Sequence, residues 1–197
     1  MVSDPKAKTI GPAQAVLAVV LQVRDGRLQV LLWERALDPG RGSWSLPGGT
    51  LAEGETLEHS IRRHLATKVD VRELSHLEQL ETRSDPNRHP ERWELATAYL
   101  GLVPSDADPE APPDTRWHPV DALPAMAFDH RPIVLAGRDR LRGKLSYTNI
   151  GFALAPQAFT ISELRGLYPF VPGDIVKLYL AAAALPAAWK LVNRIRR

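Results

Sequence analysis

A glycine turn that leads through a short loop into an uninterrupted helical segment constrains the fold of this chain most strongly. Residues 44–49 (W-S-L-P-G-G) have the composition of a short strand that ends in a tight turn, and a helix can resume only after Gly54. Residues 56–69 contain no proline or glycine, and apolar side chains recur there every four residues at Leu57, Ile61 and Leu65. Thr56 is a suitable N-cap. We therefore predict a loop followed by an amphipathic helix.

Strands are expected on both sides of this helix. Residues 15–23 are rich in valine and leucine, as in a strand buried on both faces, and Asp25-Gly26 supplies a hairpin turn into a second strand at 28–33. Further strands are predicted at 74–82 and 93–103, with a short one at 116–118. Strands that flank a helix without repeat periodicity indicate a mixed α/β (α+β) fold.

The last third of the chain is expected to be helical and basic. We predict helices at 133–145, at 160–168 with a capping box, and at 174–196 with a kink at Pro186. Residues 1–129 carry 14 Lys/Arg against 20 Asp/Glu, whereas residues 130–197 carry 11 against 3. Three helices within this basic segment fit a small helix-turn-helix-like unit that contacts phosphates, although a solvated basic face with a basic tail fits the charges equally well.

The expected domain boundary lies near residues 124–130, which gives domains at 1–127 and 128–197. The chain has no cysteine, which excludes disulfides and thiolate metal sites. Its N-terminus lacks the pattern of a signal peptide. The longest apolar stretch, 175–192, could span a membrane by length, but it contains Lys177, Pro186 and Lys190. We expect a cytoplasmic protein with no membrane partner.

Residues 49–71 resemble the Nudix motif, in which a glycine, five residues, a glutamate and seven residues precede R-E-hydrophobic-x-E-E-x-G-hydrophobic. The positions that match are Gly49, Glu55, Arg63, Leu65 and Val71. The preceding W-S-L-P-G-G is similar to the W-x-L-P-G-G common in this superfamily. The resemblance implies a Nudix-like α/β/α sandwich.

The three helix positions at which that family places glutamates carry His64, Thr67 and Lys68. Residues at this spacing share one helix face, so three carboxylates there would hold Mg²⁺ through oxygen ligands. Threonine and a single imidazole are poor ligands for Mg²⁺, and a lysine adds a positive charge. We predict no metal site and no catalytic residue, so hydrolysis should be absent or vestigial. Lys68 could instead neutralise the pyrophosphate of a ligand.

Further segments resemble the NrtR family of Nudix-related transcriptional regulators of NAD metabolism: residues 30–36 (V-L-L-W-E-R-A), 77–90, 115–124, 128–130 (F-D-H) and 140–156. The resemblance implies a Nudix-like sensor domain that binds ADP-ribose or a related NAD metabolite as its effector, with no required cofactor. It also implies a small winged helix-turn-helix domain that binds operator DNA as a homodimer. After residue 170 the chain departs from that pattern, because this segment is apolar where a basic recognition helix is expected.

The sensor motifs suggest a set of ligand-binding residues: Arg35, Trp44, Gly48, Gly49, Glu55, Arg63, Lys68 and Arg88. Arg35 and Arg88 are the candidates for pyrophosphate contacts, since guanidinium groups match phosphate oxygens, although either would equally suit an ordinary surface arginine. The DNA-binding candidates are Arg138, Arg140, Arg142 and Lys144, which would equally suit the exposed face of a helix packed on the sensor domain. His130 is either a cap at the domain junction or a ligand contact.

Two other functions stay open at this point. One is a divergent Nudix hydrolase that cleaves ADP-ribose-like nucleoside diphosphates, with Mg²⁺ held by Glu53, Glu55 and Glu58. The other is a protein-binding Nudix-like module without either activity. The sequence does not identify the effector or the operator, nor does it say whether the ligand promotes or releases DNA binding.

Overall fold

The computed structural model describes residues 11–155. The expected helices at 160–168 and 174–196, the kink at Pro186 and the winged helix-turn-helix unit lie outside the described residues. Within residues 11–155, no helix is long and apolar enough to cross a membrane.

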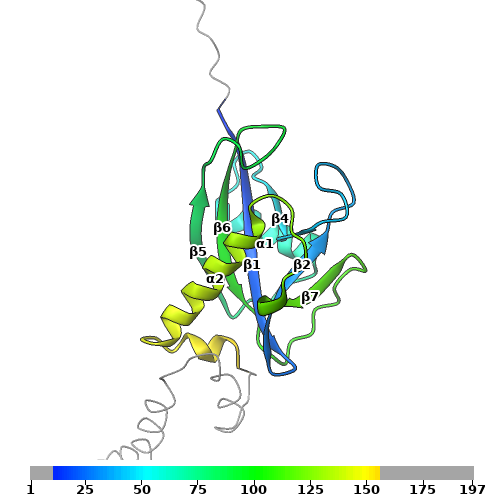
Figure 1. Cartoon of the computed structure of the whole chain (residues 1–197). Coiled ribbons are helices and arrows are strands. Elements are labelled where there is room, and N and C mark those ends of the chain that lie inside the picture. The colour runs from blue at the N-terminus through cyan, green and yellow to red at the C-terminus, as the bar shows by residue number, and fades with distance from the viewer. Residues whose placement is uncertain (1–10, 156–197) are drawn as a thin grey trace, which may run out of the picture.

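A β-hairpin forms the centre of the fold (Figure 1). Strand β1 (Ala13–Arg24) and strand β2 (Arg27–Glu34) pair in antiparallel register from Leu21 opposite Val30 to Arg24 opposite Arg27. The turn residues Asp25 and Gly26 have φ values of 51° and 69°. Tight two-residue hairpins favour such left-handed residues because they match the twist of the strands. The predicted hairpin is confirmed.

Within residues 11–155, the hairpin belongs to a mixed sheet of seven strands, in which the main path runs β3-β2-β1-β6-β5. The other strands are β3 (Trp44–Ser45), β4 (Gly48–Thr50), β5 (His76–Arg83), β6 (Glu94–Leu102) and β7 (Thr115–Pro119). Strand β1 runs parallel to β6 and antiparallel to β2 and β4. The predicted strands at 74–82, 93–103 and 116–118 correspond to β5, β6 and β7.

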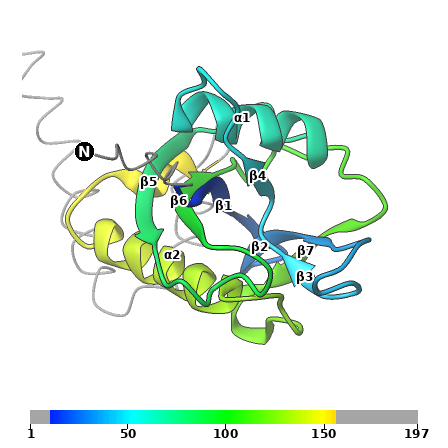
Figure 2. The same cartoon turned by 90° about the horizontal axis from the view of Figure 1, so that it is seen from above.

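One helix covers each face of the sheet, as the view from above shows (Figure 2). Helix α1 (Leu57–Lys68) shares a core with the even-numbered residues Val16, Ala18 and Val20 of β1. Helix α2 (His130–Leu145) shares the other core with the odd-numbered residues Leu17, Val19 and Leu21. Because successive side chains of a strand point to opposite faces, a strand that is apolar throughout serves both cores. The predicted α/β/α sandwich is confirmed.

Helix α1 begins and ends with residues suited to those positions. The Thr56 hydroxyl accepts a hydrogen bond from the His59 backbone N–H at 3.2 Å, which confirms the predicted N-cap. Beyond the C-terminus, Asp70 has a φ of 53°. This residue occupies the glycine position of the Nudix pattern, where glycine adopts the left-handed conformation without steric cost. Asp70 therefore holds a conformation that glycine would adopt more easily.

Helix α2 starts three residues before the predicted start at residue 133. Pro132 lies in its first turn, where a backbone N–H has no partner within the helix, so the proline does not interrupt it. Gly137 lets the helix approach the sheet, since a Cβ atom there would lie 2.8 Å from Val19 Cγ1. The helix expected to open the second domain thus packs on the sheet of the first. Two short 3₁₀ helices, η1 (Val120–Ala122) and η2 (Ile150–Ala153), lie on either side of α2 in the chain.

Candidate functional site

The sequence predicted a turn at Gly48 and Gly49, but both residues belong to strand β4 and lie directly against helix α1 (hereafter the glycine turn), on the face where the Nudix pattern has glutamates. A Cβ atom on Gly48 would come within 2.1 Å of the Val16 carbonyl oxygen, because β4 pairs closely with β1. A Cβ atom on Gly49 would come within 2.5 Å of the His64 ring. Backbone atoms leave no room for a side chain at Gly48, and a side chain at Gly49 would have to displace the His64 ring, so the two glycines let the backbone carbonyls of this segment approach the helix.

His64 and Thr67 both direct their polar atoms at backbone carbonyls. The buried His64 Nε2 lies 3.0 Å from the Thr50 carbonyl oxygen, and burial lowers the pKa of the imidazole. The ring is therefore neutral near pH 7, and the carbonyl assigns the proton to Nε2. The exposed Thr67 hydroxyl donates to the Arg63 carbonyl oxygen at 2.8 Å. Neither side chain offers an oxygen ligand toward the turn.

Lys68 points into the space between the helix and the turn. Its Nζ donates a hydrogen bond to the Gly48 carbonyl oxygen at 2.7 Å and lies 5.2 Å from the centre of the Trp33 ring. Burial, and after it the nearby positive charge of Arg35, lower the pKa of the ammonium. No carboxylate of the described residues pairs with Lys68. The charge is thus held by a carbonyl dipole and an aromatic face.

Arg35, the residue that follows β2, is likewise held by a carbonyl oxygen and an aromatic ring. Its Nε donates to the Pro39 carbonyl oxygen at 2.8 Å, and its guanidinium lies 4.8 Å from the centre of the Phe128 ring. Phe128 has a φ of 51°, which is rare for a residue with a bulky side chain. Such strain often accompanies a functional position. Arg35 also has no carboxylate partner within residues 11–155.

Glu55 and Arg63 form a two-bond ion pair beside the turn. Arg63 Nε and Nη2 each donate to a Glu55 carboxylate oxygen at 2.7 Å, and the Ala52 backbone N–H donates to the same carboxylate at 3.2 Å. These hydrogen bonds, led by those from Arg63, lower the pKa of Glu55 to about 2. Both carboxylate oxygens are therefore committed to fixing the loop in front of helix α1.

The donor set at this helix does not fit a divalent cation. Glu55 is bound by Arg63, Glu58 pairs with Arg62 across one helical turn, and Glu53 is exposed to solvent. Among the residues that the structure describes, no group of three His, Asp or Glu side chains could hold a metal ion. Lys68 also binds the Gly48 carbonyl oxygen, and its positive charge repels a cation. The residues present thus suit an anion.

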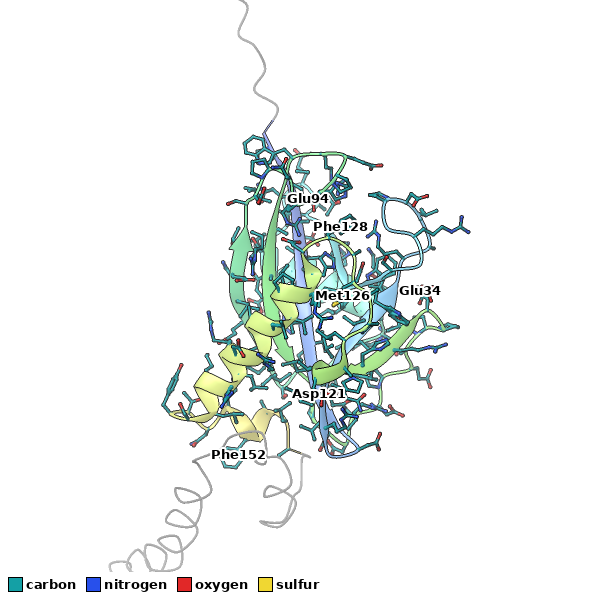
Figure 3. All side chains as sticks on the ribbon, viewed as in Figure 1. Glu34, Glu94, Asp121, Met126, Phe128 and Phe152 are labelled. Atoms are coloured by element: carbon teal, nitrogen blue, oxygen red, sulfur yellow. The ribbon has the colours of Figure 1, made fainter. Side chains whose placement is uncertain are left out.

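Arg88 is buried in an internal ion-pair network. Its Nη1 lies 2.8 Å from a Glu94 oxygen, and its Nη2 lies 2.8 Å from an Asp129 oxygen. Arg92 also pairs with Glu94. The network ties the start of β6 to the start of α2, at the end of the sheet where Figure 3 shows Glu94 and Phe128. A phosphate contact by Arg88 would require its guanidinium to leave both carboxylates.

His130 and Trp44 contact the rest of the fold from the α2 side of the sheet. The Leu46 backbone N–H donates to His130 Nδ1 at 3.0 Å, and burial lowers the pKa of His130 to about 4. This hydrogen bond links helix α2 to the segment that precedes Gly48. The Trp44 ring packs against His118 at 4.3 Å and joins the core beneath α2. Trp44 therefore lies across the sheet from Lys68.

The four predicted DNA-binding side chains of α2 form two separate pairs. Arg138 and Arg142 are one helical turn apart, as are Arg140 and Lys144, and the two pairs differ by about 200° around the helix axis. Arg140 and Lys144 both pair with Glu78 of β5. Arg138 and Arg142 line a cleft of about 290 Å³ between α2 and the β1–β2 hairpin. Helix α2 packs on the sheet through its apolar side chains, and the DNA contacts of these four basic residues stay a prediction.

Two aromatic residues of the site, Trp33 and Phe128, were not among the predicted ligand-binding residues. Both lie in segments that resemble the NrtR family, 30–36 and 128–130, so the family segments were the available signal. Their positions beneath Lys68 and Arg35 depend on tertiary packing. The left-handed backbone at Phe128 has no local signal, because glycine and asparagine are the residues that normally indicate it.

Known proteins match this chain over most of its length. Residues 12–136 match the NUDIX domain family. The ADPR responsive transcriptional repressor NtrR of Acinetobacter baylyi is 29% identical over 169 residues, which cover 82% of this chain and 67% of that protein. The ADP-ribose pyrophosphatase of Methanocaldococcus jannaschii is 28% identical over 139 residues, which cover 68% of this chain and 75% of that protein.

Solved structures of NrtR from Shewanella oneidensis are also similar. One is 31% identical with a TM-score of 0.75 and covers 82% of this chain and 77% of its own. A complex of that protein with a 27mer DNA is 28% identical with a TM-score of 0.72, covering 87% and 83%. Its NUDIX domain with ADP ribose is 34% identical with a TM-score of 0.61, covering 71% and 94%. These structures share the sandwich described above.

Proposed function

The chain belongs to the NrtR family of NUDIX-domain proteins, and on that premise we propose that it is a transcriptional regulator of NAD metabolism that responds to ADP-ribose. Its NUDIX domain binds the nucleotide, and its C-terminal part binds operator DNA. The relatives support both ligands, since one is named for its response to ADPR and another has been solved with DNA and with ADP ribose. A homodimer and the identity of the operator are part of the proposal.

One observation carries the sensing role, namely the Lys68 ammonium on the Gly48 carbonyl oxygen, 2.7 Å away. In a hydrolase of this type the same helix face holds metal ions, which activate water and stabilise the charge that develops on phosphate oxygens. A fixed lysine can attract the phosphates but cannot activate a water molecule in that way. The site should therefore bind a nucleoside diphosphate and leave it intact.

The proposed ligand contacts divide by position. Arg35, Lys68 and the Gly48–Gly49 turn contact the phosphates, while Glu55 and Arg63 fix the loop in front of the helix. Trp44 and Arg88 support the site from within the fold, because both are engaged by other residues. Arg142 is the better DNA candidate on α2, since Glu78 pairs with Arg140 and Lys144 and Asp139 pairs with Arg138.

The second candidate function is a divergent hydrolase of ADP-ribose-like substrates. The match to an archaeal ADP-ribose pyrophosphatase favours it. The donor set on α1 opposes it, as the three motif glutamates are replaced and Glu55 is bound to Arg63. Release of AMP from ADP-ribose in the presence of Mg²⁺ or Mn²⁺ would establish the hydrolase instead.

The regulator is tested by fluorescence anisotropy with the full chain and labelled promoter fragments of NAD-biosynthesis genes, beside a scrambled duplex of equal length. We expect tighter binding to a promoter fragment than to the scrambled duplex, and a steep loss of affinity with rising salt. Addition of ADP-ribose should change the promoter affinity by about fivefold or more. Equal affinities for all duplexes, or no response to ADP-ribose, would refute the proposal.

A further inference from the structure

We infer that this site recognises the diphosphate of its ligand without a divalent cation, because Lys68 and Arg35 supply the positive charge themselves. The inference rests on the proposed function and concerns the same site. It also reverses the usual expectation for a Nudix helix, on which carboxylates recruit metal ions that then hold the phosphates.

Lys68 and Arg35 differ from the other partly buried cations because neither pairs with a carboxylate of the described residues. Within residues 11–155, every other buried or half-buried lysine or arginine pairs with a carboxylate: Arg24, Arg63, Arg83, Arg88 and Lys144. Lys68 and Arg35 are half-buried as well, but their partners are carbonyl oxygens and aromatic rings. The fold thus keeps two cations without carboxylate partners near enough to each other for the charge of Arg35 to lower the pKa of Lys68, and this repulsion favours the binding of an anion.

Lys68 and Arg35 also keep most of their hydrogen-bond donors available for a ligand. An ammonium has three N–H donors, and Lys68 directs one at Gly48. A guanidinium has five, and among the described residues Arg35 uses only its Nε–H, on Pro39. Both Nη groups of Arg35 and two protons of Lys68 are therefore free to donate to phosphate oxygens. The aromatic faces of Phe128 and Trp33 restrict the motion of the two cations.

The contacts at Gly48 and Glu55 also exclude a metal ion from this site. The Gly48 carbonyl oxygen, which faces the helix, accepts from Lys68 Nζ at 2.7 Å. The Glu55 carboxylate, the motif carboxylate that the chain retains, is bound by both donors of Arg63 at 2.7 Å. Mg²⁺ prefers several oxygen ligands in near-octahedral geometry, and it would meet a positive charge here instead. A divalent cation therefore contributes nothing to ligand binding.

Isothermal titration of ADP-ribose into the full chain tests the inference, in EDTA and in excess Mg²⁺. We expect the same Kd in both buffers. The variant Lys68→Met should weaken binding by about tenfold to a hundredfold, since it removes a charge-assisted hydrogen bond, and Arg35→Met should weaken it in the same range. Arg62→Met is the matched control, because it removes an exposed cation from the same helix and should bind like the wild type.

The variant Lys68→Glu separates charge from packing. It should bind more weakly than Lys68→Met in EDTA and in Mg²⁺ alike, since the added carboxylate repels the phosphates and does not by itself give Mg²⁺ the several oxygen ligands that it prefers. A wild-type Kd that falls tenfold or more with Mg²⁺, or Lys68→Met and Arg35→Met variants that bind as tightly as the wild type, would overturn the inference while leaving the regulator intact. Absence of ADP-ribose binding in both buffers would overturn the proposed effector and the inference together.

Discussion

Protonation of the buried His130 should destabilise the protein in acid. The Leu46 backbone N–H donates to His130 Nδ1, and burial lowers the pKa of His130 to about 4 from an ordinary value of 6.5. Between these values the unfolded chain binds a proton that the folded protein does not, so stability falls as the pH falls. At about pH 5 the loss amounts to roughly 2 kcal/mol relative to about pH 8, at 1.36 kcal/mol per pKa unit. A protonated Nδ1–H would also point at the Leu46 backbone N–H, so the hydrogen bond between them would be lost.

The variant His130→Asn isolates this contribution, because an asparagine Oδ1 can accept from Leu46 in place of Nδ1 but does not titrate. Urea unfolding followed by tryptophan fluorescence gives the free energy of unfolding of both proteins at each pH. At about pH 8 the variant should be less stable by roughly 1–2 kcal/mol because of its smaller side chain. At about pH 5 that difference should vanish or reverse. Equal differences at both pH values would refute the assignment of the acid sensitivity to His130.

Three further substitutions test the packing around the site by thermal and urea unfolding. Arg88→Met should cost about 3–5 kcal/mol, since it leaves the buried Glu94 carboxylate with the partner Arg92 alone, and a loss below about 1 kcal/mol would contradict the buried network. Asp70→Gly should raise stability by about 0.5–1 kcal/mol by relieving a left-handed aspartate, and an unchanged Tm would refute the strain. Gly49→Ala should destabilise by about 1–3 kcal/mol through contact with the His64 ring, which a wild-type unfolding curve would exclude.

The central part of the fold could be predicted because its signals are local. The Asp25-Gly26 turn, the N-cap at Thr56 and the apolar spacing of the first helix each act within a few residues, and all three appear as predicted. Helix α2 starts three residues before the predicted start, because the apolar pattern that predicted it begins only at Ile133, whereas the first turn of a helix tolerates Pro132. The packing of α2 on the sheet depends on contacts distant in sequence, such as that between Gly137 and Val19.

The site was predictable in its residue types and less so in its geometry. The resemblance to the Nudix pattern placed Lys68 on the helix face that the motif glutamates occupy, and the contact with Gly48 agrees with that placement. The sequence could not show that Arg88 is enclosed by Glu94 and Asp129, because the partners are 6 and 41 residues away. It also could not show that Phe128 would lie against Arg35, since that contact depends on the left-handed backbone before α2.

The most direct test of the account is the affinity of the full chain for promoter DNA, measured in EDTA with increasing ADP-ribose, for the wild type and for Lys68→Met. The account predicts that ADP-ribose changes the wild-type affinity for DNA without any metal. It also predicts that Lys68→Met needs about tenfold to a hundredfold more nucleotide for the same change. A response that requires Mg²⁺, or one that is identical in the two proteins, would contradict the claim that Lys68 binds the nucleotide in place of a metal ion.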